Sequence, residues 1–258
     1  MKLEAAAVSK HFRLDGGTLT ALENVSLSVR PGEFVSLVGP SGCGKSTLFN
    51  ILAGLELPDG GNVRIDGMDV TGRLGLVAYM PQKDLLLPWK SVLDNTVVGA
   101  RLRGISKADA RREALAWFHR FGLQGFERSY PAALSGGMRQ RAALLRTLLC
   151  RREILLLDEP FGALDALTRI DMQTWLVDIR RELDNTIVLI THDVDEAIYL
   201  SDRVFVMSSR PGRVLADVPI LVERRGEHEE TATSPAFVGV KRDLLRLLRP
   251  NGAHEEVA

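Results

Sequence analysis

Residues 34–47 read FVSLVGPSGCGKST. The apolar start, Phe34 to Val38, predicts a buried strand, and the residues from Thr47 to Leu55 have helical character. The glycine-rich loop between them matches the phosphate-binding pattern G-x-x-x-x-G-K-[ST], in the strand–loop–helix context that this pattern requires. Its glycines let backbone N–H groups surround phosphate oxygens at the positive end of a helix dipole. The residues that this pattern assigns to binding a nucleoside triphosphate are Gly39, Pro40, Ser41, Gly42, Cys43, Gly44, Lys45, Ser46 and Thr47.

The other half of a nucleotide-hydrolysing site follows a second apolar run, LLLDEP at residues 155–160. In the phosphate loop, Lys45 would reach the β- and γ-phosphates and Ser46 would bind Mg²⁺. A carboxylate at the end of a neighbouring buried strand can meet that ion, and Asp158 suits this role. Glu159 suits the activation of the attacking water, with an acidic helix cap as the alternative for this residue.

Strand and helix patterns alternate along the chain, which predicts an α/β fold with a largely parallel sheet. The predicted strands are Thr20–Val29, Phe34–Val38, Val63–Gly67, Gly75–Met80, Ile154–Leu157 and Thr186–Ile190, followed by a hairpin of Val204–Met207 and Val214–Val218. Beyond residues 47–55, helices are predicted within Trp89–Cys150, where Ser106 to Asp109 suggests a capping box, and over Thr168–Leu183 and Ser234–Leu248. Glu227–Ala232 predicts a polar linker.

The octet LSGGMRQR, residues 134–141, predicts a second phosphate-binding helix start. Ser135 and the glycine amides can form a helix N-terminus that binds a phosphate. One chain cannot easily aim two such termini at one nucleotide, so a second chain is implied. The octet resembles the signature sequence of the ATP-binding-cassette (ABC) ATPases, and Ser135 precedes Asp158 by 158 − 135 = 23 residues, the spacing of that family.

The resemblance implies a P-loop NTPase of ABC type, with a RecA-like mixed sheet core, an antiparallel β subdomain and an inserted α-helical subdomain. It also implies a head-to-tail dimer with two ATP molecules in the interface, where Ser135 and Gly137 contact the γ-phosphate bound to the opposite subunit. Further family positions are Gln82 (Q-loop, near Mg²⁺), Asp165 in the D-loop sequence GALD, the switch residue His192, and Phe12, which stands where an aromatic stacks on adenine. Here His11-Phe12 replaces the usual tyrosine, and core packing is the alternative for Phe12.

Several segments resemble the importer ATPases for nitrate, sulfonates, taurine and pyrimidine thiamine precursors. They are DLLLPW (84–89), the signature with Met138, PFGALD (160–165) and RPGRV (210–214). This resemblance implies an ATP-hydrolysing importer subunit at the cytoplasmic face of the inner membrane. Its partners would be a second copy, a membrane permease and, indirectly, an extracytoplasmic solute-binding protein. We expect the ATPase domain over residues 1–222, with the helical subdomain at about 89–150, and a linker and amphipathic helix over 223–258.

The 258-residue chain has 33 Lys and Arg and 33 Asp and Glu, so its formal net charge is zero. A uniformly basic surface for nucleic acid is therefore excluded. The neutral sum hides a basic stretch, because residues 101–152 carry 12 Lys and Arg against 3 Asp and Glu. This stretch forms a solvated helical face, or it faces ATP phosphates, an acidic permease surface or the anionic inner leaflet. No apolar run approaches the roughly 18 residues that span a bilayer.

Three other functions are alternatives to the importer. A non-transport ABC ATPase, such as a cofactor-assembly factor, is compatible with the length, and an exporter subunit would use the same chemistry. A lone P-loop kinase or GTPase leaves the signature octet and His192 unexplained. Cys43 is either a small filler of the loop or a thiol acidified by the helix N-terminus, at which alkylation would block ATP binding and MgATP would protect.

Overall fold

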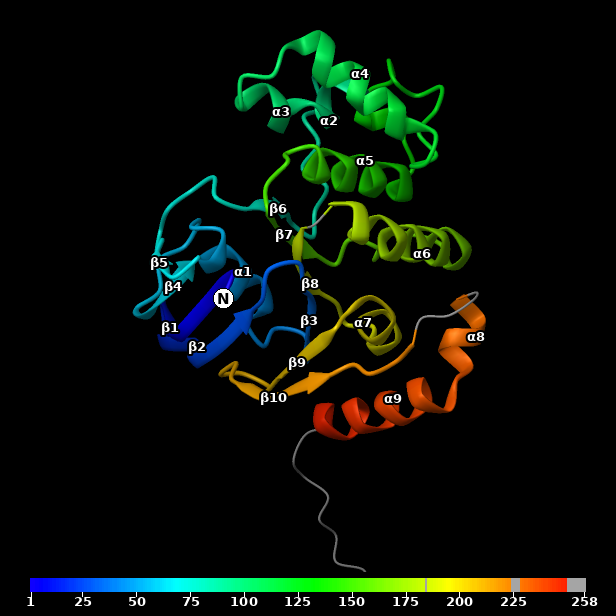
Figure 1. The fold of residues 1–258 in the computed structure, drawn as a ribbon. Helices are drawn as coiled ribbons and strands as arrows, with labels where there is room; N and C mark the ends of the chain where they lie inside the picture. Colours follow the sequence, from blue (N-terminus) through cyan, green and yellow to red (C-terminus); the bar gives the residue numbers. More distant parts are fainter. Residues whose placement is uncertain (184, 224–227, 250–258) are drawn as a thin grey trace, which may run out of the picture.

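The computed structural model describes residues 1–183, 185–223 and 228–249 of the chain. In this part the strands form two sheets, and a group of helices lies at one end of the molecule (Figure 1). The smaller sheet is antiparallel and has the order β2-β1-β4-β5. The larger sheet has the order β10-β9-β3-β8-β7-β6 and is parallel except for its edge strand β10. The predicted α/β fold with a mixed sheet and an antiparallel sheet is confirmed.

The strands of the smaller sheet are β1 (Leu3–Leu14), β2 (Gly17–Val29), β4 (Gly60–Ile65) and β5 (Met68–Asp69). Those of the larger sheet are β3 (Phe34–Val38), β6 (Ala78–Met80), β7 (Ile154–Asp158), β8 (Thr186–Ile190), β9 (Arg203–Met207) and β10 (Val214–Pro219). The predicted hairpin is β9–β10, and the other predicted strands agree with the structure within a few residues.

Strand β1 was not predicted. Its first half is rich in alanine, which has weak β-propensity. In the fold, β1 lies between β2 and β4 and pairs with both, so its backbone groups find partners on two sides. Leu3 and Val8 are fully buried there. Tertiary pairing and burial therefore override the local preference.

The helices before the last strand pair are α1 (Lys45–Leu52), α2 (Val92–Thr96), α3 (Val98–Leu102), α4 (Lys107–Phe118), α5 (Gly136–Leu148), α6 (Ala166–Leu183) and α7 (Val194–Leu200), with a 3₁₀ turn at Pro131–Ala133. Helices α2 to α5 occupy the predicted helical stretch between β6 and β7. The Ser106 hydroxyl oxygen accepts a hydrogen bond from the Asp109 amide at 3.1 Å, which confirms this part of the capping box. None of the helices in the described ranges combines the length and apolar character needed to cross a bilayer.

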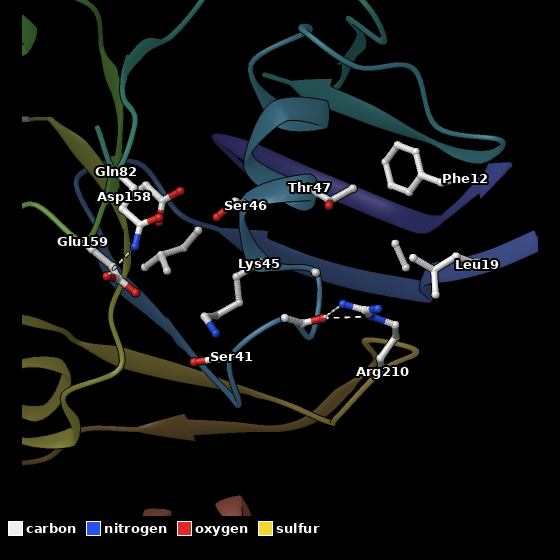
Figure 2. Close-up of a pocket in the computed structure, with 14 residues that line it drawn as sticks. Phe12, Leu19, Ser41, Lys45, Ser46, Thr47, Gln82, Asp158, Glu159 and Arg210 are labelled. Atoms are coloured by element: carbon white, nitrogen blue, oxygen red, sulfur yellow. Dashed lines mark hydrogen bonds between the residues drawn. The ribbon is translucent and has the colours of Figure 1, made fainter. Parts of the chain in front are cut away.

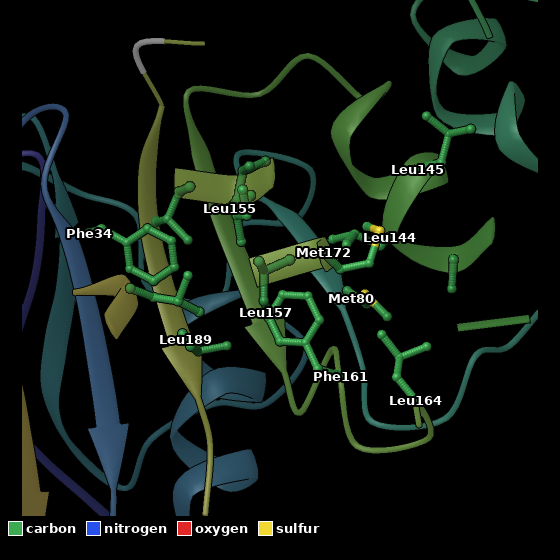
Figure 3. Packing of buried hydrophobic residues seen from close by; sticks show 14 of the residues in the cluster. Phe34, Met80, Leu144, Leu145, Leu155, Leu157, Phe161, Leu164, Met172 and Leu189 are labelled. Atoms are coloured by element: carbon green, nitrogen blue, oxygen red, sulfur yellow. The ribbon is translucent and has the colours of Figure 1, made fainter. Parts of the chain in front are cut away.

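Alternate residues of the central strands bury their side chains on opposite faces of the larger sheet. Leu155 and Leu157 of β7 pack in the cluster that includes α5, α6 and α7, as Figure 3 shows for part of it. Ile154 and Leu156 belong to the cluster on the other face, with α1 and the smaller sheet. A strand that is buried on both faces has a continuous apolar sequence, which explains the run ILLL.

The basic stretch 101–152 uses several of its arginines to hold the helical group together. Arg111 contacts both carboxylate oxygens of Asp94, at 2.7 and 2.8 Å. The Arg103 guanidinium donates to the backbone carbonyls of Cys150 and Arg151 at the end of α5. These contacts stabilise a helix terminus and a helix–helix contact. Part of the charge excess therefore has a structural role rather than forming only a solvated face.

The C-terminal segment was expected to begin with a polar linker over Glu227–Ala232, and this expectation is wrong for residues 228–232. Helix α8 (His228–Thr233) lies there, followed by α9 (Pro235–Leu248); Glu227 lies outside the described residues. The Ser234 hydroxyl caps α9 by accepting from the Phe237 amide at 3.3 Å, as its Ser-Pro start predicted. Most residues of α8 are polar, but packing beside α7 and α9 stabilises them as a helix.

Helix α9 packs against α7 and β9. Its Phe237 and Leu244 are buried in the large apolar cluster, and Lys241 forms an ion pair with Asp195 of α7 at 2.7 Å. A helix with one apolar face gains most of its stability from such packing. The C-terminal helix therefore belongs to the same core as the larger sheet.

We expect Leu244→Ala to lower the free energy of unfolding by about 2–5 kcal/mol, because it opens a cavity in a packed core. The matched control is Leu245→Ala on the same helix, since Leu245 is 43% exposed whereas Leu244 is 0% exposed. Urea unfolding of both variants measures the difference. Equal stability of the two variants would contradict the packing of α9 described above.

Candidate nucleotide site

The glycine-rich loop connects the end of β3 to the start of α1. Gly42 and Gly44 have φ angles of 73° and 107°, which favour glycine. A Cβ atom at Gly44 would also lie 2.8 Å from the Ala21 carbonyl oxygen. The Lys45 ammonium donates to the carbonyl oxygens of Gly39 at 2.7 Å and Pro40 at 2.9 Å. The loop is therefore a tight turn that holds its lysine inside the curve.

A cavity of about 370 Å³ opens above this loop (Figure 2). Its lining includes most of the predicted nucleotide-binding residues of the loop and α1, together with Phe12. It also includes Gln82, Asp158 and Glu159 from the predicted catalytic and metal-binding residues, but not the predicted catalytic His192. The lining residues that the sequence analysis did not assign to the site are Leu19, Ala21, Ile190 and Arg210. Ala21 and Ile190 lie in predicted strands, and Arg210 lies in the RPGRV segment that resembles the importer ATPases.

Asp158 ends β7 beside the phosphate loop and is almost completely buried. Burial raises its pKa, and a hydrogen bond with Ser46 and the charge of Lys45 oppose this rise. A buried carboxylate next to a hydroxyl supplies the hard oxygen ligands that Mg²⁺ takes, and this ion usually keeps water and phosphate oxygens as its other ligands. The pair Ser46 and Asp158 therefore fits a nucleotide-bound Mg²⁺. The described residues contain no group of three or more His, Cys, Asp or Glu placed to bind a metal.

Glu159 is the point where three distant segments meet. Its carboxylate accepts a hydrogen bond from the Gln82 amide at 2.9 Å, and its other oxygen lies 3.3 Å from Nδ1 of His192. The side chain of Gln140, on α5, donates to the Glu159 carbonyl at 3.0 Å. The φ angle of Glu159 is 50°. Glu159 does not cap α6, because Asp165 accepts the hydrogen bond from the Thr168 amide at the start of that helix. The structure thus brings together the three predicted catalytic residues.

The signature residues lie outside the cavity above the phosphate loop. Ser135 is the N-cap of α5, where its hydroxyl accepts from the Met138 amide at 3.2 Å, and it remains exposed. Asp165 is exposed as well, and neither residue nor Gly137 lines the cavity. Within one chain the second phosphate-binding helix start therefore does not reach the nucleotide site.

The positions of Cys43 and Phe12 favour one of the two roles predicted for each residue. The Cys43 side chain is 1% exposed and packs in the apolar cluster beneath the loop, which favours the filler role over the reactive thiol. Phe12 lines the cavity and belongs to neither apolar cluster. Its position favours a nucleotide contact over core packing.

The family model described as ABC transporter matches residues 22–162 of the chain. The chain belongs to this family. It is 43% identical to the taurine import ATP-binding protein of Pseudomonas aeruginosa, over 95% of this chain and 94% of the relative. It is 38% identical to the nitrate import ATP-binding protein of Synechocystis, over 100% of this chain and 99% of the relative. A dimeric ATP-binding cassette, solved in a post-hydrolysis state with ADP and Pi, superposes with a TM-score of 0.77 at 30% identity, covering 87% of this chain and 99% of that one.

In this ABC ATPase, one buried acid next to the site was not predicted from the sequence. Glu196 of α7 is 6% exposed and lines a small pocket with Glu159, His192 and Arg169. Its Oε1 atom has no hydrogen-bond partner among the described residues. Burial, together with the charges of Asp193 and Glu159, raises its pKa to about 8, against the lowering effects of Thr191 and Arg169. The carboxyl group is therefore protonated at neutral pH.

We expect the raised pKa of Glu196 to make the folded state less stable as pH rises. Between the unfolded value of 4.5 and about 8, the folded state keeps a proton that the unfolded state has lost. The free energy of unfolding then falls by up to about 1.4 kcal/mol per pH unit. Glu196→Gln removes this dependence, so its stability advantage over the wild type grows from pH 5 to pH 8.

Urea unfolding at several pH values measures this effect. The control is Glu230→Gln, which changes an exposed acid of α8. If the free energy of unfolding changed with pH in the same way in the wild type and in Glu196→Gln, the raised pKa of Glu196 would be contradicted.

Proposed function

We propose that this chain is the ATP-hydrolysing subunit of an ABC importer. The observation that carries the proposal is the convergence of Lys45, Asp158 and Glu159 on one cavity, with Gln82 and His192 in contact with Glu159. The taurine and nitrate import relatives favour import over export or a non-transport role. The transported solute would be of the kind named for these relatives, a small sulfonate such as taurine, or nitrate.

In the proposed mechanism, Lys45 leaves the Gly39 and Pro40 carbonyls and binds the β- and γ-phosphates. Ser46 and Asp158 would hold Mg²⁺, and the bound ion would neutralise phosphate charge. Glu159 orients the attacking water by accepting a hydrogen bond from it, and Gln82 and His192 fix the direction of its carboxylate. Stacking of adenine on Phe12 completes nucleotide binding.

The exposed signature supports assembly of the active form from two copies. Ser135 and Gly137 of one subunit would approach the γ-phosphate bound to the other, and Asp165 would contact the partner beside them. Each site is incomplete without the second chain, because the signature lies outside its own cavity. Closure of this dimer would move a membrane permease, so the chain would act at the cytoplasmic face of the membrane. A solute-binding protein on the other side would deliver the solute.

The variant Glu159→Gln tests the role of the carboxylate. We expect it to bind MgATP and dimerise but to lose ATP turnover by about 10²-fold or more, because an amide cannot accept a proton from the attacking water. Phosphate release and size-exclusion chromatography with MgATP measure the two effects. Glu229→Gln, at an exposed position of α8, is the control. Turnover near the wild-type rate would reject Glu159 as the catalytic carboxylate.

Mixing two inactive variants tests the shared site. Lys45→Ala removes phosphate binding, and Ser135→Arg blocks the signature that serves the other chain. A mixed dimer has one site with both Lys45 and Ser135 intact, so ATPase activity is expected to return on mixing. No recovery, with both variants folded by circular dichroism and with mixed dimers detected, would contradict the head-to-tail arrangement.

Membrane partnership is tested separately. Co-purification of the chain with an integral membrane protein encoded beside it distinguishes the importer from a non-transport ATPase. Stimulation of ATPase activity by a loaded solute-binding protein, in vesicles that contain the complex, supports import.

A further inference from the structure

Arg210 is a cation of the nucleotide cavity for which the catalytic arrangement above has no role. It lies in the turn between β9 and β10, far in sequence from the phosphate loop. Its guanidinium donates from Nε at 3.0 Å and Nη2 at 2.7 Å to the carbonyl oxygen of Gly42. This side chain therefore joins the turn to the outer side of the phosphate loop (Figure 2).

The charge of Arg210 is not neutralised by any acidic side chain of the described residues. Two other arginines of the same hairpin have acidic partners: Arg213 pairs with Glu23 at 2.6 Å, and Arg203 pairs with Glu33 at 3.1 Å. In contrast, no acidic side chain of the described residues pairs with Arg210, and its Nη1 has no acceptor there. A guanidinium that keeps free donors at a cavity wall is suited to bind an anion.

Backbone contacts hold the β9–β10 turn against β2 and the phosphate loop. The Gly212 amide donates to the Ala21 carbonyl at 2.9 Å, and the Glu23 amide donates to the Gly212 carbonyl at 3.0 Å. A Cβ atom at Gly212 would lie 2.1 Å from the carbonyl oxygen of Cys43, so this glycine packs directly on the phosphate loop. Arg210 is thus held on a rigid support rather than on a mobile surface loop.

The position of Arg210 along the cavity points to a particular part of the nucleotide. Figure 2 shows Lys45 between Arg210 on one side and Gln82 and Glu159 on the other. Phe12 and Leu19, which would enclose the base, lie on the same side of Lys45 as Arg210. Arg210 is therefore remote from the γ-phosphate end and next to the nucleoside end.

We propose that Arg210 is a nucleotide-binding residue that contacts the α-phosphate and ribose end of ATP and ADP, while its bond to Gly42 positions the phosphate loop. This inference rests on the proposed nucleotide site. Because the contact does not involve the γ-phosphate, it strengthens the binding of ATP and ADP by the same factor. It therefore leaves the preference of the site for ATP over ADP unchanged.

The test compares Arg210→Met, Arg210→Lys and the control Arg213→Gln, which alters an arginine of the same hairpin outside the cavity. Isothermal titration measures the Kd of ADP with Mg²⁺ at two salt concentrations, and steady-state kinetics give the KM and kcat for ATP. We expect Arg210→Met to raise the ADP Kd and the ATP KM by a common factor of about ten, with a smaller change in kcat. Its ADP Kd should also depend less on salt than that of the wild type. Arg210→Lys, which keeps the charge but loses the paired donors, should lie between.

The other outcomes separate the explanations. If the wild type does not bind ADP, the proposed function fails, whatever Arg210 does. If the wild type and Arg213→Gln bind ADP but Arg210→Met binds equally well, the inference about Arg210 is wrong. A loss of kcat or of thermal stability, with an unchanged ADP Kd and salt dependence, would leave Arg210 as a brace of the loop and overturn the proposed contact.

Discussion

The common direction of β3, β7 and β8 is the constraint on which the site depends. Because these strands are parallel and in register, their carboxyl ends meet at one edge of the sheet. The phosphate loop follows β3, Asp158 ends β7 with Glu159 directly after it, and Thr191 and His192 follow β8. Hydrogen bonds across this edge, such as Glu159 amide to Ile190 carbonyl at 2.9 Å, fix the spacing of these segments.

Several charged groups at this edge lack a partner of opposite charge among the described residues. Asp158 and Glu159 lie close together beside the neutral carboxyl group of Glu196, and burial raises the pKa of Asp158 and Glu196. On the other side, Lys45 donates to the carbonyl oxygens of Gly39 and Pro40 and to the Cys43 sulfur, and Arg210 has no acidic partner among the described residues. Such an arrangement is balanced by a ligand that brings both an anion for the basic groups and a cation for the carboxylates. A nucleoside triphosphate with Mg²⁺ has this composition.

The same edge is connected mechanically to distant parts of the chain. Helix α7 begins just after His192, and it contacts α9 through apolar packing and the pair between Asp195 and Lys241. On the opposite side, Gln82 and Gln140 connect Glu159 with the segments that lead into the helical group α2–α5. Contacts from the segments at this edge therefore reach both the helical group and the C-terminal helices.

The local patterns of the chain were enough to identify the phosphate loop, the Asp-Glu pair and the α/β class, because glycine-rich turns and doubly buried strands have direct sequence signals. Strand β1, the buried acid Glu196 and Arg210 could not be found in this way. Alanine-rich β1 is stabilised by pairing on both sides, Glu196 becomes unusual only when packing removes its water, and Arg210 reaches the cavity across 168 residues of chain to Gly42. Sequence determined the chemistry within each segment, and tertiary structure decided which segments share one cavity.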